Sequence, residues 1–212
     1  MINMKKVLIA DDHAIFREGL KLVIAKTVDM EVTDEATNGL EALRKVQEND
    51  YDLVILDISM PGRNGLEVLA DIKRAKPKLP VLIMSMHPEE QFALRAFKSG
   101  ASGYLTKGSP SQELIEALQR ISLGKRYVST ALAEVLADGL GSDSDRPLHD
   151  ELSIREYQVM CMIATGIKPQ QIADKLGMGV KTVGTYRTRV FKKMHMKSNV
   201  ELTRYVLENG LS

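Results

Sequence analysis

Short apolar runs alternate with longer amphipathic stretches over the first 123 residues of the chain. Several of these runs have no polar position, which is typical of parallel strands covered on both faces by crossover helices. Strands are predicted at Val7–Ala10, Glu31–Ala36, Leu53–Leu56, Val81–Met84 and Gly103–Leu105. Helices are predicted at Ala14–Ala25, Gly39–Glu48, Gly65–Ala75, Glu89–Ser99 and Ser111–Leu123. The pattern therefore predicts an α/β fold, with a five-stranded doubly wound parallel sheet.

The pattern changes after residue 124, where no further strand is predicted. One helix is predicted over Ser129–Gly139, and a run of turn-forming and polar residues follows at 139–147. Four more helices are predicted, at Ser153–Thr165, Pro169–Leu176, Val180–Met194 and Ser198–Asn209. The chain therefore divides into an α/β domain at residues 1–124, a linker with one helix at residues 125–150, and a small all-α four-helix domain at residues 151–212.

The composition is that of a soluble globular protein, with 44% hydrophobic and 27% charged residues. Cys161 is the single cysteine, so no intramolecular disulfide can form, and the first residues lack the length of a signal peptide. No stretch approaches the roughly 18 apolar residues that a membrane span needs. We therefore expect a cytoplasmic protein with no membrane partner.

The net charge of +1 conceals an asymmetry between the two domains. Residues 150–212 hold ten Lys and Arg against six Asp and Glu, which gives +4, whereas the first 149 residues hold 19 against 22, which gives −3. The segment Lys181–Lys197 contains six basic residues and no acidic one. An ordinary solvated helix face would mix both signs, so this segment indicates a polyanionic partner such as nucleic acid.

Charged and hydroxyl side chains follow the predicted strands where the strands end. They are Asp11 and Asp12 after the first strand, Asp57 after the third, Ser85 after the fourth and Lys107 after the fifth. The carboxyl ends of parallel strands meet at one edge of the sheet, where ligands bind. Oxygen ligands suit Mg²⁺, and a carboxylate is a known acceptor in covalent phosphoryl transfer. The sequence predicts a magnesium site in which Asp57 attacks phosphorus and Lys107 neutralises charge.

The region from residue 4 to 123 resembles the receiver domain of bacterial two-component response regulators. The resemblance rests on residues 10–13 (Ala-Asp-Asp-His), 57–61 (Asp-Ile-Ser-Met-Pro) with Gly65, Ser85, and 103–107 (Gly-Tyr-Leu-Thr-Lys). It implies a flavodoxin-like fold and phosphorylation that requires Mg²⁺. It also implies that Asp57 is the phosphoacceptor and that a sensor histidine kinase supplies the phosphoryl group.

The same resemblance implies roles for the residues around Asp57. The metal is expected to be bound by four residues, Asp11, Asp12, Asp57 and, through its backbone carbonyl, Ser59. Ser85 and Lys107 are expected to contact the phosphoryl oxygens, and Tyr104 corresponds to the aromatic that moves inward as the Ser85 hydroxyl moves towards the phosphate. Ser59 and His87 occupy positions that tune phosphate lifetime in this family.

Three alternatives concern the acidic pocket. His13 beside the acids suggests a transition metal, but no second His or Cys lies at ligand spacing. A phosphatase of the haloacid dehalogenase type needs a second Asp two residues after its nucleophile, where this chain has Ser59. A regulator whose pocket no longer signals is the third alternative, and the complete set of pocket residues argues against it.

The predicted helix Val180–Met194 has two different faces. Its buried stripe is formed by apolar residues one or two turns apart, Val183, Tyr186, Val190 and Met194. The opposite face is basic, polar and small. Together with the preceding helix and the Gly177–Gly179 turn, it is typical of a helix-turn-helix that enters the major groove. The predicted DNA contacts are Lys181, Thr182, Gly184, Thr185, Thr188, Arg189, Lys192 and Lys193.

The region from about residue 151 to 211 resembles the four-helix output domain of the LuxR, FixJ and NarL group of response regulators. The matching motifs are residues 152–156 (Leu-Ser-Ile-Arg-Glu), 172–176 (Ile-Ala-Asp-Lys-Leu), 181–183 (Lys-Thr-Val), 192–194 (Lys-Lys-Met) and 201–202 (Glu-Leu). The resemblance implies binding to double-stranded promoter DNA. With the receiver, it implies a phosphorylation-dependent transcriptional regulator that is not an enzyme beyond its own phosphorylation and dephosphorylation.

The last predicted helix is apolar on two sides. Leu202, Tyr205 and Val206 lie on one side, and Val200 and Leu207 lie on the other. A helix of this kind must bury both sides, so the second can cover a twin domain in a homodimer on DNA. Packing of Val200 and Leu207 within one domain is the alternative. RNA polymerase is a further candidate partner.

Overall fold

The computed structural model describes residues 4–61, 63, 65–87, 89–130, 132–133 and 147–211. Contacts within the chain divide it into two compact units, Met1–Gly141 and Ser142–Ser212. No helix among the described residues is both long and apolar enough to span a membrane.

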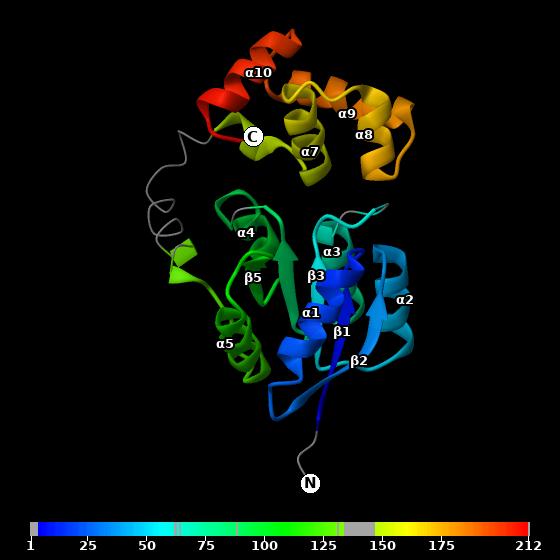
Figure 1. The fold of residues 1–212 in the computed structure, drawn as a ribbon, viewed down its shortest axis with the longest axis vertical. Coiled ribbons are helices and arrows are strands. Elements are labelled where there is room, and N and C mark those ends of the chain that lie inside the picture. Colours follow the sequence, from blue (N-terminus) through cyan, green and yellow to red (C-terminus); the bar gives the residue numbers. More distant parts are fainter. Residues whose placement is uncertain are drawn as a thin grey trace. The chain divides into compact units, whose positions relative to one another are not determined.

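The first unit contains a five-stranded parallel sheet with the order β2-β1-β3-β4-β5 (Figure 1). The strands are β1 (Lys5–Ala10), β2 (Met30–Ala36), β3 (Leu53–Asp57), β4 (Val81–Ser85) and β5 (Gly103–Thr106). The helices are α1 (Ala14–Ile24), α2 (Gly39–Glu48), α3 (Gly65–Ala75), α4 (Glu89–Lys98) and α5 (Ser111–Ser122). This is the predicted doubly wound fold, and the predicted elements differ from the observed ones by at most two residues at an end.

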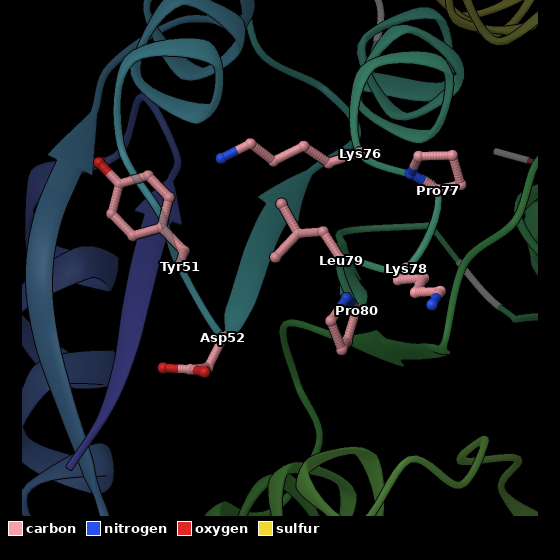
Figure 2. Close-up of a pocket in the computed structure, with 7 residues that line it drawn as sticks. All are labelled: Tyr51, Asp52, Lys76, Pro77, Lys78, Leu79 and Pro80. Atoms are coloured by element: carbon pink, nitrogen blue, oxygen red, sulfur yellow. The ribbon is translucent and has the colours of Figure 1, made fainter. Parts of the chain in front are cut away.

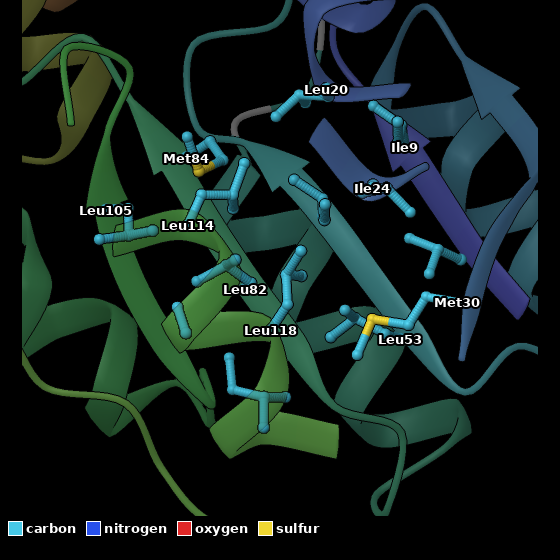
Figure 3. Close-up of a cluster of buried hydrophobic side chains, with 14 of the residues drawn as sticks. Ile9, Leu20, Ile24, Met30, Leu53, Leu82, Met84, Leu105, Leu114 and Leu118 are labelled. Carbon is cyan, nitrogen blue, oxygen red and sulfur yellow. The ribbon is translucent and has the colours of Figure 1, made fainter. Parts of the chain in front are cut away.

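Helices cover both faces of this sheet. Leu20 and Ile24 of α1 and Leu114 and Leu118 of α5 pack on one face in a buried apolar cluster (Figure 3). Their partners are strand residues that point to the same face, Val7, Ile9, Leu53, Ile55, Leu82, Met84 and Leu105. The alternate strand positions are also buried, on the face covered by α2, α3 and α4. Burial on both faces explains why the strands read as continuous apolar runs.

The parallel arrangement brings the carboxyl ends of the strands to one edge. Asp57 is paired in register with Met84, and Ser85 with Thr106. Gly65 opens α3 directly behind Asp57, and a Cβ added there would lie 2.5 Å from the Asp57 carbonyl oxygen. A side chain at residue 65 would therefore displace the strand end that carries Asp57.

The second unit is helical, with η1 (Leu148–Glu151), α7 (Ile154–Ala164), α8 (Pro169–Leu176), α9 (Val180–Lys193) and α10 (Asn199–Glu208). Ser153 and Glu156 form a capping box at the start of α7. Gly177 ends α8 in the left-handed conformation, with φ of 60°, as a glycine readily does. The four predicted helices form, but the 3₁₀ helix η1 was not predicted, because four residues are too few to show a period.

The predicted linker helix Ser129–Gly139 is described only at its start. Residues 130, 132 and 133 are helical, and the rest of that helix, with the polar run up to residue 146, lies outside the described residues.

Candidate functional site

A cluster of acidic side chains lies at the carboxyl edge of the sheet. Asp11, Asp12, His13 and Asp57 each offer one ligand atom, and these atoms all lie within 4.8 Å of one another. Asp11 and Asp57 are buried, whereas Asp12 and His13 are exposed. Adjacent residues after β1 and the last residue of β3 thus converge from two neighbouring strands.

Lys107 reaches this cluster from the end of β5. Its Nζ lies 2.8 Å from Asp57 Oδ2 and 2.7 Å from Asp11 Oδ2, and its side chain is 4% exposed. The Phe16 ring packs against the ammonium, with its centroid 4.8 Å from Nζ. The Lys107 backbone N–H donates to the Ser85 carbonyl at 2.6 Å, which ties the end of β5 to the end of β4.

Asp57 is held at the centre of the pocket in an unfavourable environment. Burial raises its pKa above the ordinary value, and the neighbouring Asp11 charge acts in the same direction. Lys107 and the Ser59 backbone N–H, which donates to Asp57 Oδ1 at 2.9 Å, oppose this shift without cancelling it. Additional positive charge in the pocket would therefore stabilise the ionised carboxylate of Asp57.

The donor set fits a hard divalent cation. It offers carboxylate oxygens from Asp11, Asp12 and Asp57, which Mg²⁺ accepts. Asp11 Oδ2 is buried and lies 2.7 Å from Lys107 Nζ, which is within ion-pair distance. The geometry of this contact is not that of a hydrogen bond. This oxygen therefore keeps a lone pair for a cation. His13 Nδ1 lies 2.9 Å from Asp12 Oδ1 and adds one nitrogen at the rim.

Ser85, His87 and Tyr104 form a hydrogen-bonded group beside Asp57. Ser85 Oγ accepts the His87 backbone N–H at 3.0 Å, and the Tyr104 hydroxyl donates to the His87 carbonyl at 3.1 Å. Ser85 and Tyr104 are fully buried, so the Tyr104 ring lies inward. Burial lowers the pKa of His87, and its ring packs edge-on to Phe92 at 5.1 Å.

In the second unit, α9 presents a basic and polar surface. Val183, Val190 and Met194 are buried at 0–1% exposure, as the predicted stripe requires, while Tyr186 is half-buried. Seven of the eight predicted DNA contacts are exposed, namely Lys181, Thr182, Gly184, Thr185, Thr188, Arg189 and Lys192. A Cβ added at Gly184 would meet nothing within 4 Å, so packing within this unit does not require a glycine there.

Two family models match the chain, one to each unit. Residues 7–119 match the response regulator receiver domain, and residues 150–206 match the bacterial regulatory proteins of the luxR family. The chain belongs to the LuxR-type response regulators. Like other NarL/FixJ-family members, this response regulator is a phosphorylation-dependent, DNA-binding regulator of transcription.

Relatives and solved structures agree over nearly the full length of the response regulator. It is 37% identical over 210 residues to Response regulator GacA of Pseudomonas aeruginosa, covering 98% of each chain. It is 34% identical to Response regulator UvrY of Escherichia coli, covering 100% of this chain and 96% of that one. RcsB of Salmonella enterica serovar Typhimurium, solved on promoter rprA with the phosphomimetic BeF₃⁻, has a TM-score of 0.66 at 25% identity, covering 96% and 98%.

Lys193 of the response regulator occupies a different environment from the other predicted DNA contacts. Its Nζ donates to Glu156 Oε2 at 2.7 Å and to the Glu151 carbonyl at 3.0 Å, and its side chain is 38% exposed. The ammonium therefore joins the end of α9 to η1 and to the start of α7. This arrangement favours an internal structural role for Lys193 over contact with DNA.

The last helix, α10, divides as its sequence predicts. Leu202 and Val206 are fully buried, whereas Val200 is 78% and Leu207 66% exposed. The exposed pair does not pack inside its own unit. The intradomain alternative for Val200 and Leu207 is therefore wrong.

Residue patterns did not identify three contacts near the sites. Arg17 contacts the Asp11 carbonyl, Phe16 packs on Lys107, and Glu89 accepts a hydrogen bond from Ser129. Each joins segments that are distant in sequence or involves a backbone atom, so no spacing rule predicts it. The Ser153–Glu156 capping box did have a readable signal, Ser-x-x-Glu before an apolar run.

A hollow at the opposite, amino-terminal end of the strands is lined by apolar and polar residues, and two of its polar side chains, Tyr51 and Lys76, bond within the chain (Figure 2). The Tyr51 hydroxyl at its edge donates to Asp34 at 2.8 Å, and burial with this bond raises the pKa of Tyr51 to about 12. Lys76 Nζ donates to the Asn49 carbonyl and to Asp50. This hollow is not a candidate site.

Proposed function

We propose that Asp57 is the phosphoacceptor of this response regulator and that its donor is the phosphohistidine of a sensor histidine kinase. The observation that carries the proposal is a buried carboxylate at the strand edge, 2.8 Å from a buried ammonium and next to two further carboxylates. An Asp57 oxygen attacks phosphorus as the bond to the kinase imidazole breaks. The O–P bond forms in a pocket where Lys107 offsets the added negative charge.

The proposal assigns Mg²⁺ to the carboxylates of Asp11, Asp12 and Asp57 and to the backbone carbonyl of Ser59. When bound, the ion supplies charge neutralisation to the phosphoryl oxygens. The Ser59 N–H contact with Asp57 supports this assignment, because it holds the Ser59 backbone against the phosphoacceptor. Ser85 and Lys107 are proposed to contact the phosphoryl group, with Tyr104 as the switch residue.

The proposed output is binding to double-stranded promoter DNA by the second unit. The receiver is assigned to residues 1–124, the linker to 125–150 and the DNA-binding domain to 151–212. The proposed contacts are seven exposed residues of α9, namely Lys181, Thr182, Gly184, Thr185, Thr188, Arg189 and Lys192. The bare surface at Gly184 would let the helix approach DNA closely.

We further propose that Val200 and Leu207 pair two DNA-binding domains as a homodimer on DNA. The support is the exposure of both side chains on one side of α10. The protein is proposed to act in the cytoplasm, to recruit or contact RNA polymerase, and to have no catalysis beyond turnover of its own phosphoryl group.

Labelling with a small acyl phosphate tests the phosphoacceptor. In Mg²⁺, the wild-type chain should take up one acid-labile and hydroxylamine-sensitive phosphoryl group, and Asp57→Asn should take up none, because an amide is no nucleophile. Asp50→Asn is the control, since Asp50 is fully exposed at the other end of the sheet. An acid-stable label, or one undiminished in Asp57→Asn, contradicts the assignment.

A further inference from the structure

Arg17 of α1 connects the ends of the first two strands. Its Nη1 donates to the backbone carbonyl of Asp11 at 2.8 Å, and its Nε donates to Glu35 Oε2 at 2.8 Å. The side chain is 13% exposed, so both contacts are largely shielded from water. One planar guanidinium thus connects Asp11, the neighbour of Asp12, to Glu35 near the end of β2.

Glu35 is shared between Arg17 and Lys21, one helical turn further along α1. Hydrogen bonds from Lys21 and then from Arg17 hold the pKa of Glu35 below its ordinary value. Glu35 is therefore charged at neutral pH, and both contacts are charge-assisted. Of the two cations, Arg17 also contacts Asp11.

We infer that Arg17 is a positioning residue for the divalent-cation site, an inference that rests on the proposed magnesium-dependent function. The Asp11 N–H donates to the Ala36 carbonyl at 3.0 Å, and the Asp11 carbonyl accepts from Arg17. Both backbone polar groups of Asp11 are therefore fixed by hydrogen bonds. That hold directs the carboxylates of Asp11 and Asp12 towards Asp57. A lysine could not replace Arg17, because a single ammonium lacks the forked geometry that serves two acceptors in different directions.

Two matched variants of the full chain test the inference. Arg17→Gln and Lys21→Gln each remove a cation from Glu35, but only the first removes the hold on Asp11. Calorimetric titration with MgCl₂ should show Mg²⁺ affinity about 10–100-fold weaker in Arg17→Gln, the range for residues that orient metal ligands. Lys21→Gln should stay within about twofold of wild type.

Thermal unfolding without Mg²⁺ separates positioning from folding, since both variants should retain a cooperative transition. Equal Mg²⁺ affinities in the two variants, or an Arg17→Gln affinity equal to wild type, overturn the inference while wild-type binding upholds the proposed function. Absence of Mg²⁺ binding by the wild-type chain overturns both.

A separate observation concerns the route out of the receiver. The buried Ser129 hydroxyl donates to the buried carboxylate of Glu89, the first residue of α4, and accepts the Leu132 backbone N–H at 3.1 Å. The Ala133 N–H donates to the Ser129 carbonyl at 3.0 Å, so Ser129 caps the helical turn that opens the linker. One hydroxyl thus joins α4 to the start of the linker.

The other end of this route is the phosphoacceptor pocket. His87 lies between Ser85 and Glu89, with its N–H on Ser85 Oγ and its carbonyl on the Tyr104 hydroxyl. If Ser85 Oγ turns towards an anion on Asp57, its hydrogen bond from the His87 N–H is lost. Glu89, the first residue of α4, follows His87 by two positions, so a change at His87 lies close to the Glu89–Ser129 hydrogen bond.

We propose that the Glu89–Ser129 hydrogen bond transmits the state of Asp57 to the linker, by controlling how Ser129 caps the Leu132 backbone N–H. This proposal also rests on phosphorylation of Asp57. Loss of the bond frees the Ser129 side chain and weakens the cap, which exposes the Leu132 amide to exchange.

Amide hydrogen exchange at Leu132 in the full chain tests the proposal. With Mg²⁺ and beryllofluoride, a phosphoryl analogue, exchange in the wild type should accelerate about fivefold or more, an opening energy within reach of a lost cap. In Glu89→Ala, exchange should already be fast and should change by less than about twofold. Glu116→Ala is the control, because Glu116 is an exposed carboxylate of α5 paired with Arg120, and it should respond as wild type.

The amide signal of Lys107 reports separately whether beryllofluoride occupies the Asp57 pocket. Occupancy with a wild-type response in Glu89→Ala overturns the proposal. Occupancy with no Leu132 response in the wild type also overturns it, and leaves the phosphoacceptor assignment intact. Absence of occupancy in the wild type overturns both.

Discussion

Two adjacent lysines at the end of α9 should behave differently towards DNA. Lys192 is exposed, whereas Lys193 is engaged by Glu156 and by the Glu151 carbonyl. Lys192→Ala should therefore remove a phosphate contact, and Lys193→Ala should remove an internal tie. The two variants have the same change in charge and in side-chain size, so each is the control for the other.

The size of each effect follows from its cause. One phosphate contact contributes about 0.9 to the magnitude of the slope of log affinity against log salt. When salt rises from about 50 to 200 mM, the DNA affinity of wild type should therefore fall about 3.5-fold further than that of Lys192→Ala. Breaking a buried ion pair costs about 3–5 kcal/mol. Because the Lys193 side chain is 38% exposed, while that of Glu156 is 4% exposed, we expect about 1–2 kcal/mol of unfolding free energy for Lys193→Ala.

Binding isotherms with phosphorylated full-length protein, at several salt concentrations and on a selected and a scrambled site, give the slopes. Urea unfolding gives the free energies. The opposite roles would follow if Lys193→Ala lowered the magnitude of the salt slope by about one and left the unfolding free energy unchanged, while Lys192→Ala did not alter the slope.

Three further predictions use the same protein. Lys181, Thr185 and Thr188 point outward from the first nine residues of α9. Alanine at one of them that contacts a base should cost about 1–3 kcal/mol on the selected site and less on the scrambled one. Burial raises the pKa of Glu156, but hydrogen bonds from Lys193 and Ser153 outweigh it and bring the pKa below 4.5. The stability that Glu156 contributes is thus present above pH 4.5 and lost as pH falls through the lowered pKa, so Glu156→Gln should flatten the acid limb of urea unfolding free energy against pH. Val200→Asp should weaken binding to paired half-sites about tenfold or more and leave binding to one half-site near wild type, and unchanged binding to both in a gel-shift titration would oppose the dimer surface.

The pocket could be predicted because it depends on strand ends. Asp11, Asp57, Ser85 and Lys107 each follow an apolar run, and parallel strands bring such positions to one edge whatever the side chains between them. The inward position of Tyr104 and the hold of Arg17 on a carbonyl depend on tertiary packing. Neither has a period or a spacing that the sequence could reveal.

Lys193 shows why the DNA surface was harder to predict. A helical wheel gives the direction of Cβ, and it places Lys193 beside the buried stripe. Four methylene groups carry the ammonium well beyond that point, and a buried carboxylate at Glu156 decides where it ends. The exposed pair Val200 and Leu207 was predictable because short apolar side chains stay near their Cβ atoms.

A phosphoryl group on Asp57 is proposed to raise the affinity of the DNA-binding domain for promoter DNA. The most direct measurement is the affinity of full-length protein for a selected site, with and without a small acyl phosphate in Mg²⁺, for wild type and Asp57→Asn. We predict tighter binding with acyl phosphate for wild type and no change for Asp57→Asn. An equal gain in both proteins, or no gain in a wild-type protein that carries the label, would contradict it.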